Sequence, residues 1–180
     1  MIQIITPEST GLADWIGVGI SFAALLGAII SVLLTRSSVR SQDKHNRLSL
    51  RPLPRIAVGD YVHRLHVKVV NDGPGPMIIE AVRVSDGTTT TDNVLAFMSE
   101  ISEKIVWEDF VVEATGRSIR SNDEMILIAL NGEPTDPIFV TAHNSVRNIL
   151  ATLTVEVEFT DVYGSKFEVC KRVLTWFART

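Results

Sequence analysis

The sequence is poor in the residues that build disulfide frameworks, aromatic cores and charged surfaces. It has one cysteine, Cys170, in 180 residues, so no disulfide can form within the chain and an oxidising compartment is not indicated. Aromatic residues make up 7% and charged residues 21%, the latter slightly below the roughly 25% of soluble globular chains. With 46% apolar residues, this composition excludes a disordered tail, a collagen-like repeat and a disulfide scaffold. The length suggests about one domain.

Positive charge is missing from the first 34 residues and is concentrated directly after them. Residues 1–34 contain Glu8 and Asp14 but no Lys or Arg, residues 35–51 have a balance of +4, and residues 52–180 have a balance of −6. The formal net charge of −4 is opposite in sign to that of a general nucleic-acid binder. We therefore expect no duplex nucleic acid as a partner.

The stretch Trp15–Leu34 has no charge and no proline. Its 20 residues read WIGVGISFAALLGAIISVLL, and as a helix they would be about 30 Å long, the thickness of a bilayer's hydrocarbon core. A buried soluble helix and a cleaved signal peptide are the alternatives. The acidic N-terminus and the length of the apolar run disfavour a signal peptide. The sequence predicts a transmembrane helix at 15–34, with Trp15 as an interfacial anchor.

The charge asymmetry around this helix predicts its orientation. Basic residues follow the helix and none precedes it, so the positive-inside rule places the C-terminal side in the cytoplasm. We expect a single-pass protein of a cell inner membrane with four segments: an extracytoplasmic tail at 1–14, the helix, a basic juxtamembrane linker at 35–50 and a cytoplasmic domain at 51–180.

The linker has two possible conformations, and its positive charge has two possible roles. It could continue the helix or form a tether, until Pro52 and Pro54 end any helix. Its basic residues would be attracted to anionic lipid at the membrane surface, although a plain stop-transfer flank already explains their charge. The predicted membrane-surface residues are Arg36, Arg40, Lys44 and Arg47.

Small residues recur every four positions along the predicted span. Gly19, Ala23, Gly27 and Ser31 form one stripe, and such stripes let helices approach closely and favour homo-oligomers in lipid. Small residues are also common in membrane helices in general. No ionisable residue lies inside the span, so a pore would require several copies.

Period-two alternation predicts strands in the remaining 130 or so residues. The clearest is 151–160, which the turn at 161–164 joins to a second strand through 175. A second pair of strands is expected at 61–70 and 77–84, on either side of the turn cluster 71–76. In the first of these strands Leu65, Val67 and Val69 should point inward and His66 outward. Shorter strands are expected at 125–130, 56–58 and 110–112.

Helical spacing appears twice in the same region. Residues 94–105 follow the spacing of a buried helical face, with Thr91 or Asp92 as the cap, and residues 144–150 suggest a short helical turn. Six to eight strands with one or two short helices predict a mainly β fold, an immunoglobulin-like antiparallel β-sandwich.

Three segments carry a family resemblance. Leu50–Leu53, Asn71–Ile79 and Phe159–Gly164 resemble bacterial single-pass membrane proteins of uncharacterised function, in which a cytoplasmic immunoglobulin-like domain follows an N-terminal helix. The resemblance covers residues 12–180 and implies the fold but no activity. In layout, the chain is also similar to bacterial antiviral membrane effectors that join a helical anchor to a small ligand-sensing domain.

Motifs of catalysis and metal binding are missing from the sequence. It has no CxxC, HExxH, DxDxDG or GxSxG pattern, so we predict no catalytic residue, no metal and no cofactor. Glu156 and Glu158 share one strand face and are expected to solubilise it. If the domain binds an anionic ligand, arginine is the side chain best suited to it, although each candidate could equally be an ordinary surface arginine. These candidates are Arg64, Arg117, Arg120 and Arg147.

Two functions are consistent with these features. The first is a non-enzymatic, membrane-anchored binding or scaffold protein that recognises an unknown protein or small anionic ligand. The alternative is a ligand-gated effector of antiviral defence, in which a nucleotide or other signal reorganises oligomerised helices and disrupts the membrane. A hydrolase is disfavoured because no nucleophile–base pair is recognisable.

Overall fold

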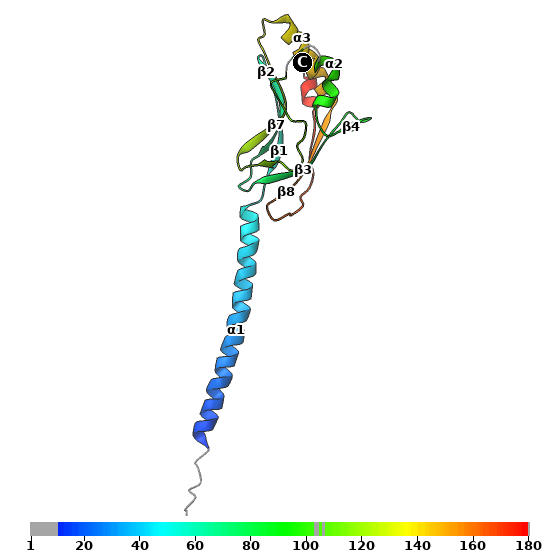
Figure 1. Ribbon diagram of the computed structural model, residues 1–180. Coiled ribbons are helices and arrows are strands. Elements are labelled where there is room, and N and C mark those ends of the chain that lie inside the picture. The colour runs from blue at the N-terminus through cyan, green and yellow to red at the C-terminus, as the bar shows by residue number, and fades with distance from the viewer. Residues whose placement is uncertain (1–10, 103–104, 106, 180) are drawn as a thin grey trace, which may run out of the picture. The chain divides into compact units, whose positions relative to one another are not determined.

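The computed structural model describes residues 11–102, 105 and 107–179, which form two compact units that meet between Asn46 and Arg47. The first unit is most of helix α1 (Leu12–Ser49, 38 residues) (Figure 1). This confirms a helix over 15–34. Of the predicted tail at 1–14, residues 1–10 lie outside the described residues.

Helix α1 continues well beyond the apolar run. Residues 35–49 include four serines, one asparagine and one histidine, which are weaker helix formers than alanine or leucine, yet the segment is helical. Starting a helix is the costly step, and the apolar segment has already formed one, so each further residue adds a hydrogen bond at little extra cost. The helix ends at Ser49, because Pro52 and Pro54 cannot continue it.

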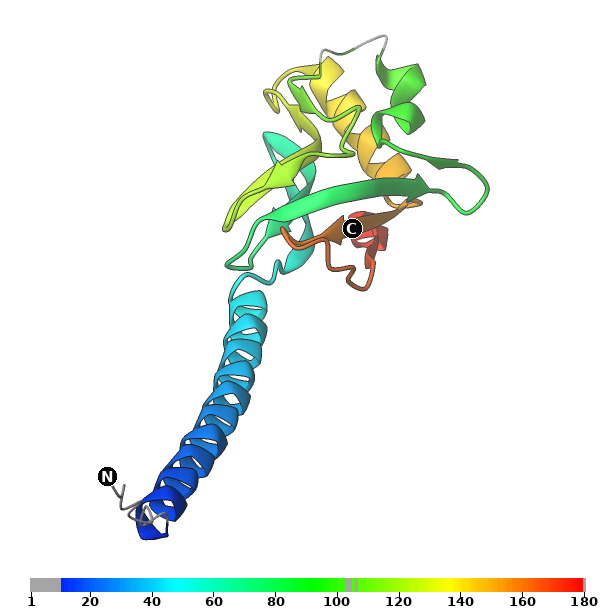
Figure 2. The same cartoon turned by 60° about the horizontal axis from the view of Figure 1, so that its bottom comes forward.

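The second unit contains two antiparallel sheets (Figures 1 and 2). The first has the order β1-β2-β7-β5 and the second the order β4-β3-β8-β9, with β6 beside β3. These are the ABED and C′CFG orders of an immunoglobulin-like sandwich, so the predicted fold class is confirmed. The strands are β1 (Pro54–Tyr61), β2 (Arg64–Asn71), β3 (Met77–Ser85), β4 (Thr90–Thr91), β5 (Asp109–Phe110), β6 (Ser118–Ile119), β7 (Asp123–Asn131), β8 (Thr154–Thr160) and β9 (Cys170–Val173).

The core lies between the inner faces of the two sheets. Leu65, Val67 and Val69 of β2 are fully buried, as predicted, and so are Val155 and Val157 of β8. All five belong to one hydrophobic cluster. The alternating pattern in the sequence therefore identified the buried face of each strand, because successive side chains of a strand point to opposite faces.

The edges of the two sheets meet along β1 and β9. The Arg172 guanidinium donates a hydrogen bond of 2.6 Å to the carbonyl of Ile56, and the Cys170 Sγ lies 3.8 Å from the carbonyl of Pro54. Burial raises the pKa of the Cys170 thiol. These contacts occupy edge carbonyls of β1 that an unrelated strand could otherwise pair with.

The prediction that His66 points to solvent is wrong. His66 is only 8% exposed. Its ring lies so close to Gly59 on the neighbouring strand that a Cβ on Gly59 would overlap it. The Tyr61 ring stacks on it with centroids 6.0 Å apart. Nδ1 of His66 is buried without a hydrogen-bond partner in the described chain, and burial lowers the pKa of this imidazole.

The helices differ from the sequence prediction in their limits and caps. The segment after residue 94 is a short 3-10 turn, η1 (Leu95–Met98), followed by α2 (Ser99–Ser102), and Asn93 rather than Thr91 or Asp92 accepts the hydrogen bond from the amide of Ala96. Where a turn at 144–150 was expected, α3 (Pro137–Leu150) has 14 residues and begins at an Asp136 cap with proline in its first turn.

The predicted hairpin at 151–175 is shorter than expected. Residues 151–153 close the end of α3, and β8 begins at Thr154. The return strand β9 begins at Cys170 rather than near Phe167, because the Asp161 carboxylate accepts hydrogen bonds from the amides of Tyr163 and Ser165 and shapes a longer loop. A final 3-10 turn, η2 (Thr175–Ala178), follows β9.

Candidate functional sites

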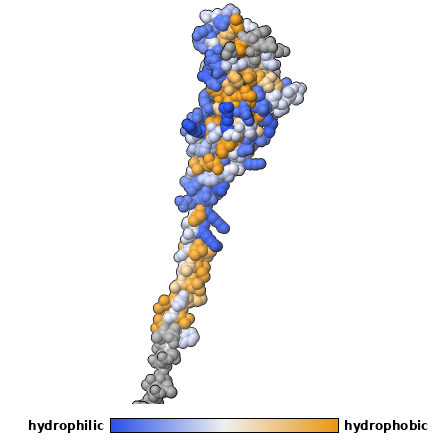
Figure 3. All heavy atoms as spheres, in the orientation of Figure 1, coloured by the Kyte–Doolittle hydropathy of each residue, from blue (hydrophilic) through white to orange (hydrophobic). Residues whose placement is uncertain are grey.

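The apolar part of α1 is the first candidate. From Trp15 to Leu34 its large side chains are exposed, from 45% for Leu26 to 76% for Trp15, and its most apolar window has a mean hydropathy of 2.4 with no buried residue. Figure 3 shows this hydrophobic surface giving way to hydrophilic residues further along the helix. One helix of the described chain is thus long and apolar enough to cross a membrane.

The small-residue stripe has no partner within the described part of the chain. A Cβ on Gly19 or Gly27 would meet no atom within 4 Å, so no described contact in this chain requires glycine there. Glycine in a helix interior costs about 1 kcal/mol relative to alanine. The Thr35 hydroxyl donates to the carbonyl of Ser31, at 2.8 Å. Oligomerisation through Gly19, Ala23, Gly27 and Ser31 stays a prediction.

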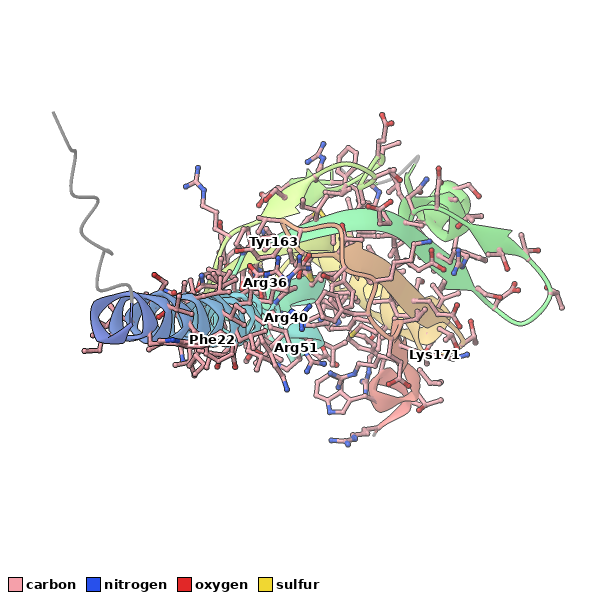
Figure 4. All side chains as sticks on the ribbon, turned by 90° about the horizontal axis from the view of Figure 1, so that it is seen from below. Phe22, Arg36, Arg40, Arg51, Tyr163 and Lys171 are labelled. Carbon is pink, nitrogen blue, oxygen red and sulfur yellow. The ribbon has the colours of Figure 1, made fainter. Side chains whose placement is uncertain are left out.

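The polar part of α1 has a basic face. Arg36, Arg40, Lys44 and Arg47 are exposed, and at 3.6 residues per turn they fall within an arc of about 80°. Figure 4 labels the first two. In the sequence these residues share only their charge, and the helical conformation places them on one face.

Asn71 organises the region where the second unit begins. Its side chain is fully buried. Oδ1 accepts hydrogen bonds from the amides of Leu53 and Gly73, at 3.2 and 3.0 Å, and Nδ2 donates to the carbonyls of Gly75, Ile119 and Arg120, at 2.7, 3.2 and 3.1 Å. One amide thus joins the segment before β1, the β2–β3 turn and the β6–β7 connection.

The same turn lies directly against the residues that follow α1. A Cβ on Gly75 would overlap the Leu50 carbonyl oxygen, and one on Gly73 would overlap backbone near Leu53. The sequence predicts a turn at residues 71–76 but not that the turn packs against a second segment. The signal for this packing was the alternation Gly73-Pro74-Gly75-Pro76, whose glycines provide room for a second backbone.

Two cation–π contacts join the same region to the β8–β9 loop. The Arg47 guanidinium lies 4.9 Å from the centre of the Tyr163 ring, and that of Arg51 lies 5.4 Å from the centre of the Phe167 ring. Such contacts stabilise exposed sites by about 0.5–1 kcal/mol each. Arg47 is therefore engaged within the second unit.

The four arginines proposed as ligand contacts are not brought to one place. Arg64 begins β2, whereas Arg117 and Arg120 flank β6, next to the opposite end of β2. Seven strand residues separate these ends, about 23 Å. Arg147 lies on α3, where its Nε contacts Asp60 Oδ2 at 3.3 Å and donates to the carbonyl of Phe177 at 2.9 Å. This guanidinium links α3 to β1 and η2.

His143 completes the polar cluster under α3. Its Nε2 is 3.1 Å from Asp60 Oδ1, although the two groups are not aligned for a hydrogen bond. Its ring packs on Phe139 with centroids 5.5 Å apart. Asp60 thus faces two basic side chains of α3, an arrangement that holds the helix on the sandwich.

The carboxylates on β8 are engaged in ion pairs. Arg83 of β3 contacts both Glu156, at 3.8 Å, and Glu158, and Lys171 of β9 is 2.8 Å from Glu156. The lysine and the arginine lower the pKa of Glu156. A carboxyl held ionised in this way is a poor general acid. Among the described residues no group of three or more His, Cys, Asp or Glu side chains could hold a metal.

An apolar groove of about 540 Å³ lies between α2 and α3. Residues with small side chains line it along α3, and isoleucines border it. Ile138 is 63% exposed. Grooves between helices take amphipathic helices or apolar ligands. No sequence pattern predicted this groove, because helical spacing was recognisable only in the last half of α3. Its lining is Ile101, Ile105, Pro137, Ile138, Thr141, Ala142, Ser145 and Ile149.

Comparison with known proteins adds no relative. No protein-family model matches the chain, and no curated protein matches it.

Proposed function

We propose that this protein is a non-enzymatic, membrane-anchored binding protein that presents its immunoglobulin-like sandwich to the cytoplasm. The observation that carries the proposal is the exposure of the whole apolar stretch Trp15–Leu34 on a helix joined to a sandwich with its own core. An uncharged, mostly apolar stretch of 20 exposed residues is stable in lipid and aggregates in water.

The binding role is supported by the groove between α2 and α3. It is bordered by apolar side chains that no other described element covers. The charged groups of the sandwich, in contrast, are engaged with one another at Arg83 and Arg147. The groove therefore offers an apolar docking place on a sandwich whose Arg83 and Arg147 are already held by carboxylates.

The orientation is tested by labelling single cysteines with a membrane-impermeant maleimide. One is placed in the N-terminal tail, Ser9→Cys, and one on an exposed loop of the sandwich, Thr115→Cys, both in a Cys170→Ser background. In intact spheroplasts of a bacterial host we expect Ser9→Cys to react and Thr115→Cys to react only after lysis. The reverse pattern would place the sandwich outside and refute the cytoplasmic assignment.

A second function, a ligand-gated membrane effector of antiviral defence, is favoured by the unexplained glycines of α1. No described contact requires them, so a second helix packed on the stripe would account for their cost. Gly19→Leu and Gly27→Leu should then abolish oligomers and toxicity with the sandwich still folded. Val18→Leu, off the stripe, is the matched control. Toxicity that survives in both glycine variants with unchanged assembly would contradict this function.

A further inference from the structure

We infer that the polar part of α1 recognises an anionic lipid surface with one face, so that the helix tilts toward that face. Arg36, Arg40 and Lys44 share the face, are exposed, and form no ion pair within the described part of the chain. The inference rests on the proposed membrane anchor and names the partner of its polar end.

The opposite face of the same helix carries no basic Lys or Arg side chain. It carries Ser38, Gln42 and His45 instead. The acidic residue of this segment, Asp43, falls about 20° from Arg36 on the basic face, so the four positive charges of this face exceed its negative charge by three. The charge is thus one-sided, and a one-sided charge favours one direction of tilt over a negative surface. A stop-transfer flank requires positive charge but not this arrangement.

The length of the helix sets how far each charge stands from the lipid. Counted from Leu34 along the axis, Arg36, Arg40 and Lys44 lie about 3, 9 and 15 Å beyond the apolar run. The headgroup layer is only about 5–8 Å thick. An upright helix would therefore place Arg36 in this layer, Arg40 at its margin and Lys44 outside it.

Tilt changes this order. Transmembrane helices tilt by about 20° on average and by up to about 40°. At this upper limit Lys44 would lie about 11 Å beyond the apolar run, with its side chain turned downward when the basic face is on the underside. Long basic side chains then reach the phosphates while their stems lie along the helix. A tilt toward the basic face thus brings all three charges onto the headgroups, whereas the opposite tilt removes them.

The experiment measures the preference for spin-labelled phosphatidylglycerol over phosphatidylcholine by the full-length chain in nanodiscs. Three single variants, Arg36→Gln, Arg40→Gln and Lys44→Gln, are compared. Lys166→Gln, an exposed lysine of the sandwich, is the control of equal charge. Each charge near an anionic surface is worth about fivefold in association. We expect Lys44→Gln to reduce the preference as much as Arg36→Gln, and Lys166→Gln to leave it unchanged.

Two results would overturn the inference. An upright helix predicts that Lys44→Gln behaves like the parent chain while Arg36→Gln weakens the preference. A parent chain without preference for the anionic lipid, or with one that persists at 1 M salt, where the screening length falls to about 3 Å, would exclude recognition by charge. Because both leaflets of a nanodisc have the same lipids, a wrong orientation of the sandwich would leave this result unaffected.

Discussion

Replacement of Asn71 by alanine should destabilise the sandwich more than any other polar substitution in it. The side chain is fully buried and faces five backbone groups. Its two amide hydrogens and its oxygen can satisfy about four hydrogen bonds at once. At about 1 kcal/mol each, Asn71→Ala should cost about 4 kcal/mol, a large part of the 5–15 kcal/mol that stabilises a typical domain.

Asn71→Asp separates the two halves of this amide. Aspartate keeps an oxygen for the amides of Leu53 and Gly73 but puts a second oxygen where Nδ2 now donates to three carbonyls. Burial and the loss of these donors make the charged form unfavourable. We therefore expect Asn71→Asp to be at least as unstable as Asn71→Ala, although it has nearly the shape of the parent side chain.

The assay is urea unfolding of the full-length protein in detergent micelles, followed by the fluorescence of Trp107 and Trp176. Asn148→Ala, an exposed asparagine on α3, is the matched control and should change the free energy of unfolding by less than about 0.5 kcal/mol. A cost below about 1 kcal/mol for Asn71→Ala, or parent-like stability for Asn71→Asp, would refute the reasoning.

Three further outcomes follow from single contacts. Gly75→Ala should destabilise the same domain by more than about 2 kcal/mol in urea, because its Cβ would overlap the Leu50 carbonyl. Asp161→Ala should cost about 2 kcal/mol by the same measurement, since two part-buried amides lose their acceptor. The domain should lose stability as pH falls below about 6.5, because the lowered pKa of His66 lets the unfolded chain bind a proton that the folded chain resists. His66→Phe should flatten that dependence in unfolding curves between pH 7.5 and 5, and an unchanged slope would assign it to other groups.

Sequence patterns predicted the strands of the core well and the connections poorly. The alternation around Val67 and Val157 reports burial on one face, which is a local property of each strand. His66 broke the pattern because its burial depends on Gly59, a residue of a neighbouring strand. The length of α3 was missed although its cap, Asp136 before Pro137, was legible in the sequence.

The candidate site residues divide in the same way. The basic residues after the span were found by charge, and their common face required only that the helix continue. The four arginines were predicted from the chemistry of their side chains, with no information on where they lie in space. The fold separates them, and Arg147 pairs with Asp60. No local pattern marks such a pairing, since the partners are far apart in sequence and meet only when α3 packs on β1.

By itself, the sequence determined a helix long and apolar enough to cross a membrane, the mainly β character of the domain and the inward faces of its central strands, because these depend on length, hydropathy and period. Tertiary structure alone decided that Asn71 would join three connections, that Gly75 would lie against Leu50, and that α2 and α3 would leave an apolar groove. Each of these results from segments that are separated in the sequence and meet in the folded domain. Local propensity depends on neighbouring residues, whereas long-range contacts depend on how the whole chain packs.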